Sequence, residues 1–470
     1  MLEGLEIREF QLSECIKNKD YRIDTDYYIK SPLKNEDLTY KRIGDCLLYS
    51  QYGISIEMNE VNKGYPIYRM NEIHDMLCDI ETNKYADIDK DTFEIFRLND
   101  KDVLFNRTNS YDFVGRTGVY YNNDGVERTF ASYLVKFVPN SEIILPEYLA
   151  TYLNTKHGIG DIKRRARQSI NQTNVNPEEV KEMDIPILSM DIQKAIQDRV
   201  VFANKLRCQA DCLYKEAGNY LSETISDKKV LISEKNINII SYKRSFLDTG
   251  RWDAEYYQPQ YEDYSKLVQS YQNSNEYIGS ICNIKDTNYI PNSKRKYKYV
   301  ELSNISKHGS IDSCTESEGR ELPSRARRIV TTGDVIVSSI EGSLDSCALV
   351  TEEYNNALCS TGFYVVRSSF FNPETLLVLF KSKPIQMLMK KGCSGTILTA
   401  ISKNELEKIP LPLITEDVQK QIAQKVQQSF SLRSESKHLL ELARQAVEIA
   451  IGEGEETALK FIKGNDNDKA

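Results

Sequence analysis

The feature that most constrains the fold of this chain is an internal duplication. Residues 185–225 align without a gap on residues 411–451, at an offset of 226 positions that brings Pro186 onto Pro412. Self-similarity over such a distance indicates a structural unit that is used twice. The 470 residues are enough for two or three domains. We therefore expect two copies of one frame within the chain.

Two shorter motifs precede the duplicated segments, in the same order in each half. The pattern R-x-D-x-[DE]-Y-Y occurs at residues 22–28 and again at residues 251–257. The segment Asp102-Val103-Leu104 likewise corresponds to Asp334-Val335-Ile336. The sequences between these motifs hardly align, so we predict a repeated frame that holds two different inserts. Because the tyrosine pair that ends the first pattern is repeated, we predict core aromatics there rather than sequence-reading residues.

Each duplicated segment has the apolar spacing of a long helix. In residues 190–225 and 416–452, apolar side chains recur every three or four positions, which predicts one buried seam with nearly coiled-coil spacing. At 1.5 Å per residue, ~35 residues form a rod of roughly 50 Å. Two such helices in one chain favour antiparallel pairing, as a spacer that also docks partners. The residues assigned to the spacer and to subunit docking are Ile192, Gln193, Ile196, Leu206, Leu213, Val418, Gln419, Ile422, Leu432 and Leu439.

The remainder of each half contains short elements of both kinds. Runs of β-branched and aromatic residues at 300–302, 335–337 and 363–366 predict strands, and segments 145–153 and 373–380 predict short helices that begin at a proline. The predicted fold class is α+β: two mixed α/β domains separated by two long antiparallel helices, with an internal pseudo-twofold repeat. The predicted divisions are a first domain at 1–189, a helix at 190–225, a linker at 226–250, a second domain at 251–415, a helix at 416–452 and a flexible tail at 453–470.

Composition excludes several classes of protein. No run of 18 apolar residues is present and the N-terminus lacks a signal peptide, so we expect a cytoplasmic protein without membrane spans. The 10 cysteines include no Cys-x-x-Cys, and reduced thiols are the favoured interpretation, with Cys208 and Cys212 as a weak alternative pair of metal ligands. The net charge of −8 means that nucleic-acid binding would require a local basic face.

With these features in hand, the chain resembles the specificity subunits of Type I restriction–modification systems over residues 15–455. The segments Ile185–Gln193 and Leu411–Gln419 carry the resemblance, because that family has a proline-rich turn there before a conserved helix. In this chain the usual Glu-Gln at the helix start is Asp-x-Gln, and the usual double proline is absent. The resemblance implies two target-recognition domains that each read one half of a split DNA site.

The same resemblance implies the partners. They are double-stranded DNA, two adenine-N6 methyltransferase subunits and the motor–nuclease restriction subunits. S-adenosylmethionine, ATP and Mg are expected on those partner subunits, whereas this chain is expected to bind no cofactor or metal and to catalyse no reaction.

Candidate DNA contacts come from basic clusters and from polar turns that follow the matching strands. The densest cluster, residues 163–172, combines arginines, which pair with guanine and phosphate, with Asn and Gln, which fit adenine edges. A solvated surface or an ordinary polar turn is the plainer alternative at each position. The predicted DNA contacts are Arg69, Asn106, Arg107, Asn109, Lys163, Arg164, Arg165, Arg167, Gln168, Asn171, Lys294, Arg295, Lys296, Arg325, Arg327, Ser339, Ser394 and Thr396.

Two other functions remain open at this stage. A self-contained methyltransferase or nuclease component of another phage-defence system would need its own catalytic motifs, but the chain has no Pro-Pro, and Gly158-Ile-Gly160 does not follow a predicted strand. A stand-alone DNA-binding regulator would be expected to show a helix-turn-helix signature, and none stands out. Co-purification with a methyltransferase would separate a specificity subunit from a regulator.

Overall fold

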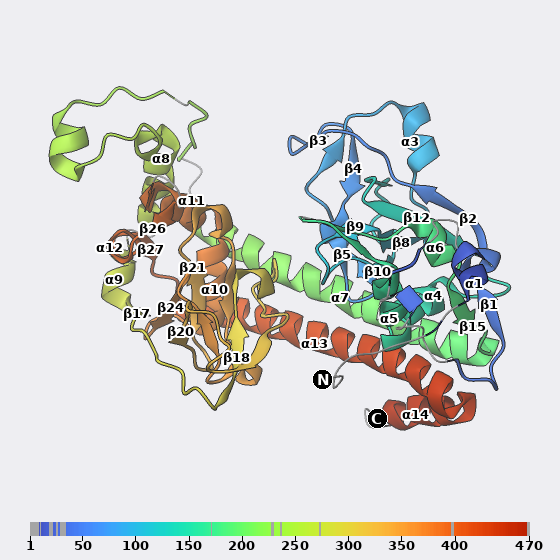
Figure 1. Ribbon diagram of the computed structural model, residues 1–470. Coiled ribbons are helices and arrows are strands. Elements are labelled where there is room, and N and C mark those ends of the chain that lie inside the picture. The colour runs from blue at the N-terminus through green and yellow to red at the C-terminus, as the bar shows by residue number, and fades with distance from the viewer. Residues whose placement is uncertain are drawn as a thin grey trace. The chain divides into compact units, whose positions relative to one another are not determined.

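The computed structural model describes residues 9, 11–17, 22–24, 27–28, 34–170, 172–226, 230–235, 237–271, 274–395 and 399–467. The chain divides into two compact units. The first is formed by Met1–Cys208 together with Arg433–Ala470, and the second is formed by Gln209–Leu432. The two long helices are α7 (Met190–Ile225) and α13 (Glu416–Glu453), as predicted (Figure 1). Each unit therefore contains one mixed α/β domain together with part of each long helix.

The two long helices pack against each other in antiparallel orientation. In the first unit, the hydroxyl of Ser436 on α13 donates to the carbonyl of Ala203 on α7 at 2.7 Å. In the second unit, the hydroxyl of Ser429 donates to the carbonyl of Ala210, also at 2.7 Å. All four side chains are small and buried, which lets the two backbones approach closely. The duplication at offset 226 places Ala203 on Ser429 and Ala210 on Ser436, so the two contacts occupy equivalent places.

The apolar seam of the helices is formed as predicted, but it faces inward. Ile192, Ile196 and Ile422 are fully buried, and Leu206 and Leu439 are 5% and 7% exposed. Because these side chains are covered by the chain itself, their assignment to subunit docking is corrected and only the spacer role remains. The other apolar residues of that assignment, Leu213, Val418 and Leu432, are partly buried.

The first unit builds its domain around a six-stranded sheet in the order β2-β12-β8-β10-β6-β5. Its strands are β2 (Leu47–Tyr52), β12 (Leu134–Pro139), β8 (Val103–Asn106), β10 (Thr117–Val119), β6 (Leu77–Cys78) and β5 (Ile73–His74). A four-stranded sheet adds β11 (Thr129–Phe130), β4 (Tyr65–Tyr68), β7 (Tyr85–Ala86) and β3 (Met58–Asn59). A pair, β1 (Tyr40–Arg42) with β15 (Asp184–Pro186), closes the domain before α7.

The first unit also contains short helices between and before these strands. They are α1 (Leu12–Lys17), α3 (Lys90–Phe96), α4 (Pro146–Leu153), α5 (Lys156–Arg165) and α6 (Pro177–Lys181), with short 3-10 turns η1 (Ile43–Cys46) and η2 (Met70–Glu72). Helix α4 begins at a proline, as its sequence predicts, and all of its residues are buried.

The second unit contains a four-stranded sheet in the order β17-β24-β21-β22 and another in the order β19-β18-β23-β20. Their strands are β17 (Cys282–Lys285), β24 (Phe363–Ser368), β21 (Val335–Ser338), β22 (Cys347–Leu349), β19 (Thr315–Glu318), β18 (Lys296–Val300), β23 (Leu358–Ser360) and β20 (Ala326–Ile329). The pair β16 (Asn275–Tyr277) with β27 (Pro410–Pro412) precedes α13, as β1 and β15 precede α7.

The helices of the second unit are α8 (Pro259–Ser270), α9 (Ile278–Ile281), α10 (Pro373–Lys381), α11 (Lys383–Gly392) and α12 (Lys403–Glu407). Three of them, α10, α11 and α12, correspond to α4, α5 and α6 of the first unit. Short turns are η3 (Lys243–Leu247, a π-helical turn), η4 (Glu255–Tyr257), η6 (Leu302–Asn304), η7 (Glu341–Ser343) and η8 (Glu352–Tyr354).

The two domains share one topology, although their inserts hardly align in sequence. The strand order β2-β12-β8-β10 of the first domain corresponds to β17-β24-β21-β22 of the second. A second sheet contains one parallel strand pair in each domain, β4 with β11 in the first and β18 with β23 in the second. Strands at 335–337 and 363–366 are confirmed. The predicted strand at 300–302 is only partly correct, because β18 ends at Val300 and a 3-10 turn begins at Leu302.

The C-terminal segment differs from its prediction as a flexible tail. Residues Glu455–Asn467 form helix α14, which follows Gly454, whose φ of +95° allows the chain to turn after α13. Ala458 and Ile462 are buried four residues apart on one face of α14. The carboxylate of Glu455 accepts the backbone N–H of Ser189 at 2.8 Å and so caps the start of α7. The short apolar repeat in this polar segment is therefore sufficient to hold a helix against the first unit.

No helix among the described residues is long and apolar enough to cross a membrane.

Candidate nucleic-acid interface

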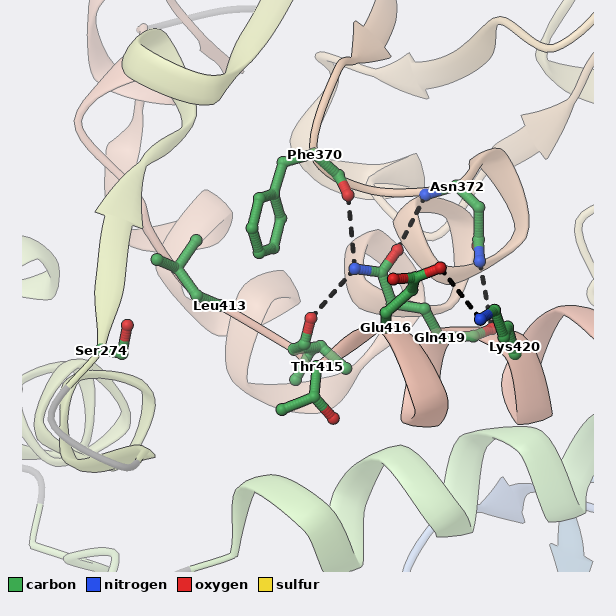
Figure 2. A pocket seen from close by; sticks show the side chains of 9 residues that line it. Ser274, Phe370, Asn372, Leu413, Thr415, Glu416, Gln419 and Lys420 are labelled. Carbon is green, nitrogen blue, oxygen red and sulfur yellow. Dashed lines mark hydrogen bonds and ion pairs between the residues drawn. The ribbon is translucent and has the colours of Figure 1, made fainter.

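The glutamine of the duplicated helix start joins each domain to its long helix. Figure 2 shows Gln419 near the start of α13: its Oε1 accepts the N–H of Asn372 at 2.9 Å, and its Nε2 donates to the carbonyls of Ile414 at 2.9 Å and Phe370 at 3.3 Å. These groups border an open cavity of about 770 Å³ at the helix start. Gln419 itself is 6% exposed. It is therefore a structural tie between α10 and α13, which corrects its assignment to subunit docking.

Gln193 makes the same three contacts in the first unit. Its Oε1 accepts the N–H of Leu145 at 2.8 Å, and its Nε2 donates to the carbonyls of Leu188 at 2.9 Å and Ile143 at 3.2 Å. The side chain is fully buried, so its assignment to subunit docking is corrected as well. The Asp-x-Gln motif thus sets the orientation of each domain on the helix that follows it.

A small three-stranded sheet of the first unit brings together candidate residues that lie far apart in sequence. Strand β14 (Thr173–Asn174) pairs with both β13 (Arg167–Gln168) and β9 (Thr108–Asn109). The hydroxyl of Thr108 donates to the side-chain carbonyl of Asn174 at 2.7 Å. The strands β13 and β14 form a hairpin whose turn is closed by the N–H of Ser169 donating to the carbonyl of Gln172 at 2.8 Å. We name residues 167–174 the first hairpin.

The second unit has the same construction at the equivalent place. Strand β25 (Cys393–Ser394) pairs with β26 (Ala400–Ile401), and the N–H of Ile401 donates to the carbonyl of Ser339 at 2.8 Å. In the first unit the N–H of Val175 donates to the carbonyl of Arg107 at 2.9 Å. The polar turns that follow the strands β8 and β21 are therefore joined to a hairpin in both units, as the matched motifs suggest. We name the described residues 393–395 and 399–401 the second hairpin.

The exposed surface of the first hairpin is chemically suited to duplex DNA. Arg167, Gln168, Ser169 and Gln172 are exposed, and Ile170 at the turn is fully exposed. The guanidinium of Arg167 lies 2.7 Å from the carboxylate of Glu179, which orients it while 47% of the side chain stays in contact with solvent. Among the described residues of this hairpin, the predicted contacts Arg167 and Gln168 therefore face outward.

The remainder of the basic cluster is used inside the domain. Lys163 donates from Nζ to the carbonyls of Val114, at 3.1 Å, and Tyr111, and burial lowers the pKa of its ammonium group. Arg164 donates to the carbonyl of Tyr27 at 2.6 Å and is paired with Asp161. These interactions occupy both side chains in the structure.

Two predicted contacts are contradicted by burial. Arg165 is 5% exposed, forms an ion pair with Asp161 and donates to the carbonyl of Glu179 at 3.1 Å. Asn106 is fully buried, and its Oδ1 accepts the N–H of Thr108 at 3.3 Å. A buried side chain with these partners cannot reach a base edge, so both residues are reassigned to support of the first hairpin.

The three other candidates of the first unit are only partly exposed. Arg107 lies with its guanidinium carbon 5.3 Å from the ring of Tyr52, and Asn109 accepts the N–H of Ser110 at 2.8 Å. Arg69 pairs with Glu72 at 2.6 Å and has 24% of its side chain exposed. None of the three is excluded as a DNA contact by its burial.

The candidates of the second unit are more exposed. Lys294, Arg295 and Lys296 are all exposed at the start of β18, and the guanidinium of Arg295 lies 5.3 Å from the ring of Tyr297. No ion pair is found for these three cations among the residues that the structure describes. Arg325 pairs with Glu301 at 2.7 Å while 60% of its side chain stays exposed.

The last candidates lie near the second hairpin or outside the described residues. Ser394 is exposed on β25, whereas Ser339 is partly buried and donates to the carbonyl of Gly362 at 2.9 Å. Arg327 is also partly buried and donates to the carbonyl of Ser324 at 2.9 Å. Asn171 and Thr396 lie outside the described residues.

The sequence motifs did not point to Glu179, which lies on helix α6 and whose carboxylate forms an ion pair with Arg167. Its position in the first turn of α6 could be found only through its equivalence to Glu405 in the duplicated frame. Within the described part of the chain, no group of three or more His, Cys, Asp or Glu side chains is placed to bind a metal. No disulfide joins any of the ten cysteines.

The chain is similar to known proteins in sequence and to solved structures. No protein-family model matches the chain. The putative Type I restriction enzyme MjaX specificity subunit of Methanocaldococcus jannaschii is 22% identical over 421 residues, which cover 88% of this chain and 92% of that protein. Among solved structures, the Type I restriction–modification S subunit from M. genitalium is 14% identical, with a TM-score of 0.39, and covers 89% of this chain and 97% of its own. The HsdS subunit from Thermoanaerobacter tengcongensis is 13% identical, with a TM-score of 0.28, and covers 90% of this chain and 98% of its own. Along 88% of its length, this chain is therefore similar in sequence to a putative Type I restriction enzyme specificity subunit.

Proposed function

We propose that the chain is the DNA-specificity subunit of a Type I restriction–modification complex and that each mixed domain reads one half of a split duplex site. The observation that carries this proposal is a duplicated frame that presents two chemically different hairpins. The first hairpin exposes Arg167 and Gln168, whereas on strand β25 of the second hairpin Cys393 is buried and Ser394 is exposed. Two different readers on one frame are what an asymmetric, bipartite site requires.

Base reading by the hairpins follows from groove geometry. The major groove of B-DNA admits a two-stranded β-ribbon, where arginine pairs with guanine, glutamine with adenine, and serine with either. The exposed cations Lys294, Arg295 and Lys296 suit phosphate contacts, which set position and affinity rather than sequence. The overall charge of −8 is compatible with this division, because the basic side chains needed are local.

Partner docking would use the outer faces of the long helices, since their seam is internal. On α7 of the first unit, Val201 and Phe202 are 40% and 46% exposed, which is unusual for large apolar side chains beside a buried seam. Phenylalanine is one of the aromatic residues that are enriched in the buried cores of protein–protein interfaces. We expect two adenine-N6 methyltransferase subunits to dock on the helices, with restriction subunits completing the complex. S-adenosylmethionine, ATP and Mg would be bound by those partners, and this chain would catalyse no reaction.

Mapping of methylated adenines across the genome, with and without the gene, tests the proposal. We expect deletion to remove one bipartite motif, and replacement of residues 20–184 to change only one half of that motif. An unchanged methylation pattern would contradict the proposal. So would a purified chain that transfers methyl groups or cleaves DNA without a partner.

A further inference from the structure

The repeated motif R-x-D-x-[DE]-Y-Y forms an arginine clamp in each unit. In the first unit, Nε of Arg22 lies 2.7 Å from Oδ2 of Asp24, and Nη2 lies 2.9 Å from Oδ1. In the second unit, Nε of Arg251 lies 2.8 Å from Oδ1 of Asp253, and Nη2 lies 2.6 Å from Oδ2. A bidentate pair of this kind fixes the plane of the guanidinium group. The hydrogen bond from Arg251 holds the pKa of Asp253 below its usual range, so the pair is charged at neutral pH.

The tyrosines of the motif complete the clamp, so they are partly buried supports of the arginine rather than the core aromatics that the sequence predicts. The guanidinium carbon of Arg22 lies 4.6 Å from the ring centre of Tyr27, and the hydroxyl of Tyr28 donates to the carbonyl of Arg22 at 2.8 Å. The second unit repeats both contacts. There the guanidinium lies 4.3 Å from the ring of Tyr256, and the hydroxyl of Tyr257 donates to the carbonyl of Arg251 at 3.0 Å.

Each clamp holds the backbone at the base of a hairpin. Arg22 donates to the carbonyls of Arg164 at 3.4 Å and Arg165 at 3.0 Å, in the last turn of α5 and directly before the first hairpin. Arg251 donates to the carbonyl of Cys393 at 2.9 Å, the residue that follows α11 and opens the second hairpin. The bonds of Arg22 to Arg164 and of Arg251 to Cys393 both join residues 142 positions apart. Carbonyls at a helix C-terminus lack partners within the helix and favour a nearby cation.

In the first unit the clamp also reaches a side chain that we assign to DNA. One carboxylate oxygen of Glu179 lies 3.3 Å from Nη1 of Arg22, and the other lies 2.7 Å from Nη2 of Arg167. The side chain of Glu179 is 12% exposed, so it bridges two arginines from a largely buried position. The orientation of Arg167 is therefore coupled to Arg22 through one carboxylate.

The described strands of the two hairpins are short. Each strand of the pairs β13–β14 and β25–β26 is two residues long, and an isolated hairpin of this size is not stable in water. Discrimination between bases requires donors held within a fraction of an ångström of their targets. Tertiary contacts must therefore supply the remaining rigidity, and the clamp is one that both units share, besides the backbone bonds from Val175 to Arg107 and from Ile401 to Ser339.

From this geometry we infer that Arg22 and Arg251 are positioning residues for DNA-sequence selection, each acting on the half-site that its own domain reads. Neither guanidinium needs to touch DNA, since each acts through the backbone at the base of its hairpin. The inference rests on the proposed function. It adds the prediction that the two clamps act independently, because each is built within a single unit.

Selection from a random duplex library by the full-length chain, alone or with its methyltransferase partner, tests the inference. The variants are Arg251→Met, which keeps the aliphatic stem, Arg251→Lys, which keeps the charge but not the bidentate geometry, and the counterpart Arg22→Met. Arg244→Met is the matched control, because Arg244 is an exposed arginine of the second unit whose side chain is paired only with Glu262 among its described contacts. The readout is the base preference at every position of each half-site.

We expect Arg251→Met to lower the base preference about tenfold in the half-site read by the second domain, in line with the loss of one well-placed contact. Base preference in the half-site read by the first domain should be unchanged. Arg22→Met should lower base preference only in that first half-site. The base preference of Arg251→Lys should lie between those of wild type and Arg251→Met. A purely structural role would reduce the fraction of active protein and leave the ratios between bases intact.

Equal base preference for Arg251→Met and wild type in both half-sites would overturn the inference, as would an equal loss in both. If Arg251→Met does not fold, Arg251→Lys decides between the same two outcomes. A wild-type chain that selects no bipartite site would contradict the proposed function instead, so the two failures are distinguishable.

Discussion

The tie formed by Gln419 supports a quantitative prediction about stability. In Gln419→Leu a side chain of similar size occupies the site, but all three hydrogen bonds to the backbone are lost. The site is 6% exposed, so water cannot easily replace the amide group. The N–H of Asn372, which the glutamine accepts at 2.9 Å, loses its partner together with the carbonyls of Ile414 and Phe370.

The magnitude follows from these contacts. A buried donor left without a partner costs roughly 1–3 kcal/mol, and each hydrogen bond contributes a net of about 0.5–1.5 kcal/mol. Because leucine recovers part of this loss through apolar burial, we expect the free energy of unfolding of the second unit to fall by about 2–4 kcal/mol. For a unit of this size, each kcal/mol lowers the melting temperature by roughly 2–4 °C.

The assay combines urea unfolding with hydrogen exchange on the full-length chain. Faster exchange should appear in peptides that cover the starts of α10 and α13, while peptides of the first unit should be unchanged. Gln193→Leu should give the mirror result in the first unit. Gln424→Leu is the control, because Gln424 is an exposed glutamine on the same helix. A loss below about 1 kcal/mol for Gln419→Leu, or one equal to that of the control, would refute the reasoning.

Three further predictions concern partner docking, DNA binding and pH. Phe202→Glu should abolish co-purification with the methyltransferase partner while leaving the melting temperature unchanged, since 46% of Phe202 is exposed; unimpaired co-purification would contradict this docking face. Arg167→Ala should weaken binding to the cognate duplex by about tenfold in filter-binding titrations, and no loss would remove Arg167 from the interface. Burial raises the pKa of Asp102 to about 6, so the folded first unit favours the protonated carboxyl group. The stability linked to this protonation is present in full below about pH 4 and is lost as the pH rises through 6. Wild type should therefore lose roughly 2–3 kcal/mol relative to Asp102→Asn between pH 4 and pH 7 in urea unfolding, and parallel pH profiles would disprove the role of Asp102.

Much of the frame could be predicted from the sequence, because its signals are local. The apolar spacing of residues 190–225 defines a helix of that length without reference to the rest of the chain, and α7 has the same bounds. The offset of 226 positions identified the equivalent parts of the two halves, and both Asp-x-Gln motifs occupy the same structural place. Helix α14 was missed because its two buried residues, Ala458 and Ile462, stand in an otherwise polar segment.

The shared topology of the inserts could not be read from their sequences. A strand requires only a pattern of burial, and many unrelated sequences satisfy the same pattern. The sheets β2-β12-β8-β10 and β17-β24-β21-β22 show the correspondence that the alignment did not. Parts of the chain with little sequence similarity can thus occupy equivalent places in the two domains.

What the sequence determined by itself is the duplicated frame, the two long helices and the approximate places of the basic clusters. Only the tertiary structure decided which cations face solvent. Lys163, Arg164 and Arg165 stand beside Arg167 in the sequence, yet the first three are occupied by carbonyls and carboxylates of the domain. The physical reason is that a cation takes the nearest acceptors in space, and the carbonyls of Val114 and Tyr27 come near Lys163 and Arg164 only after folding.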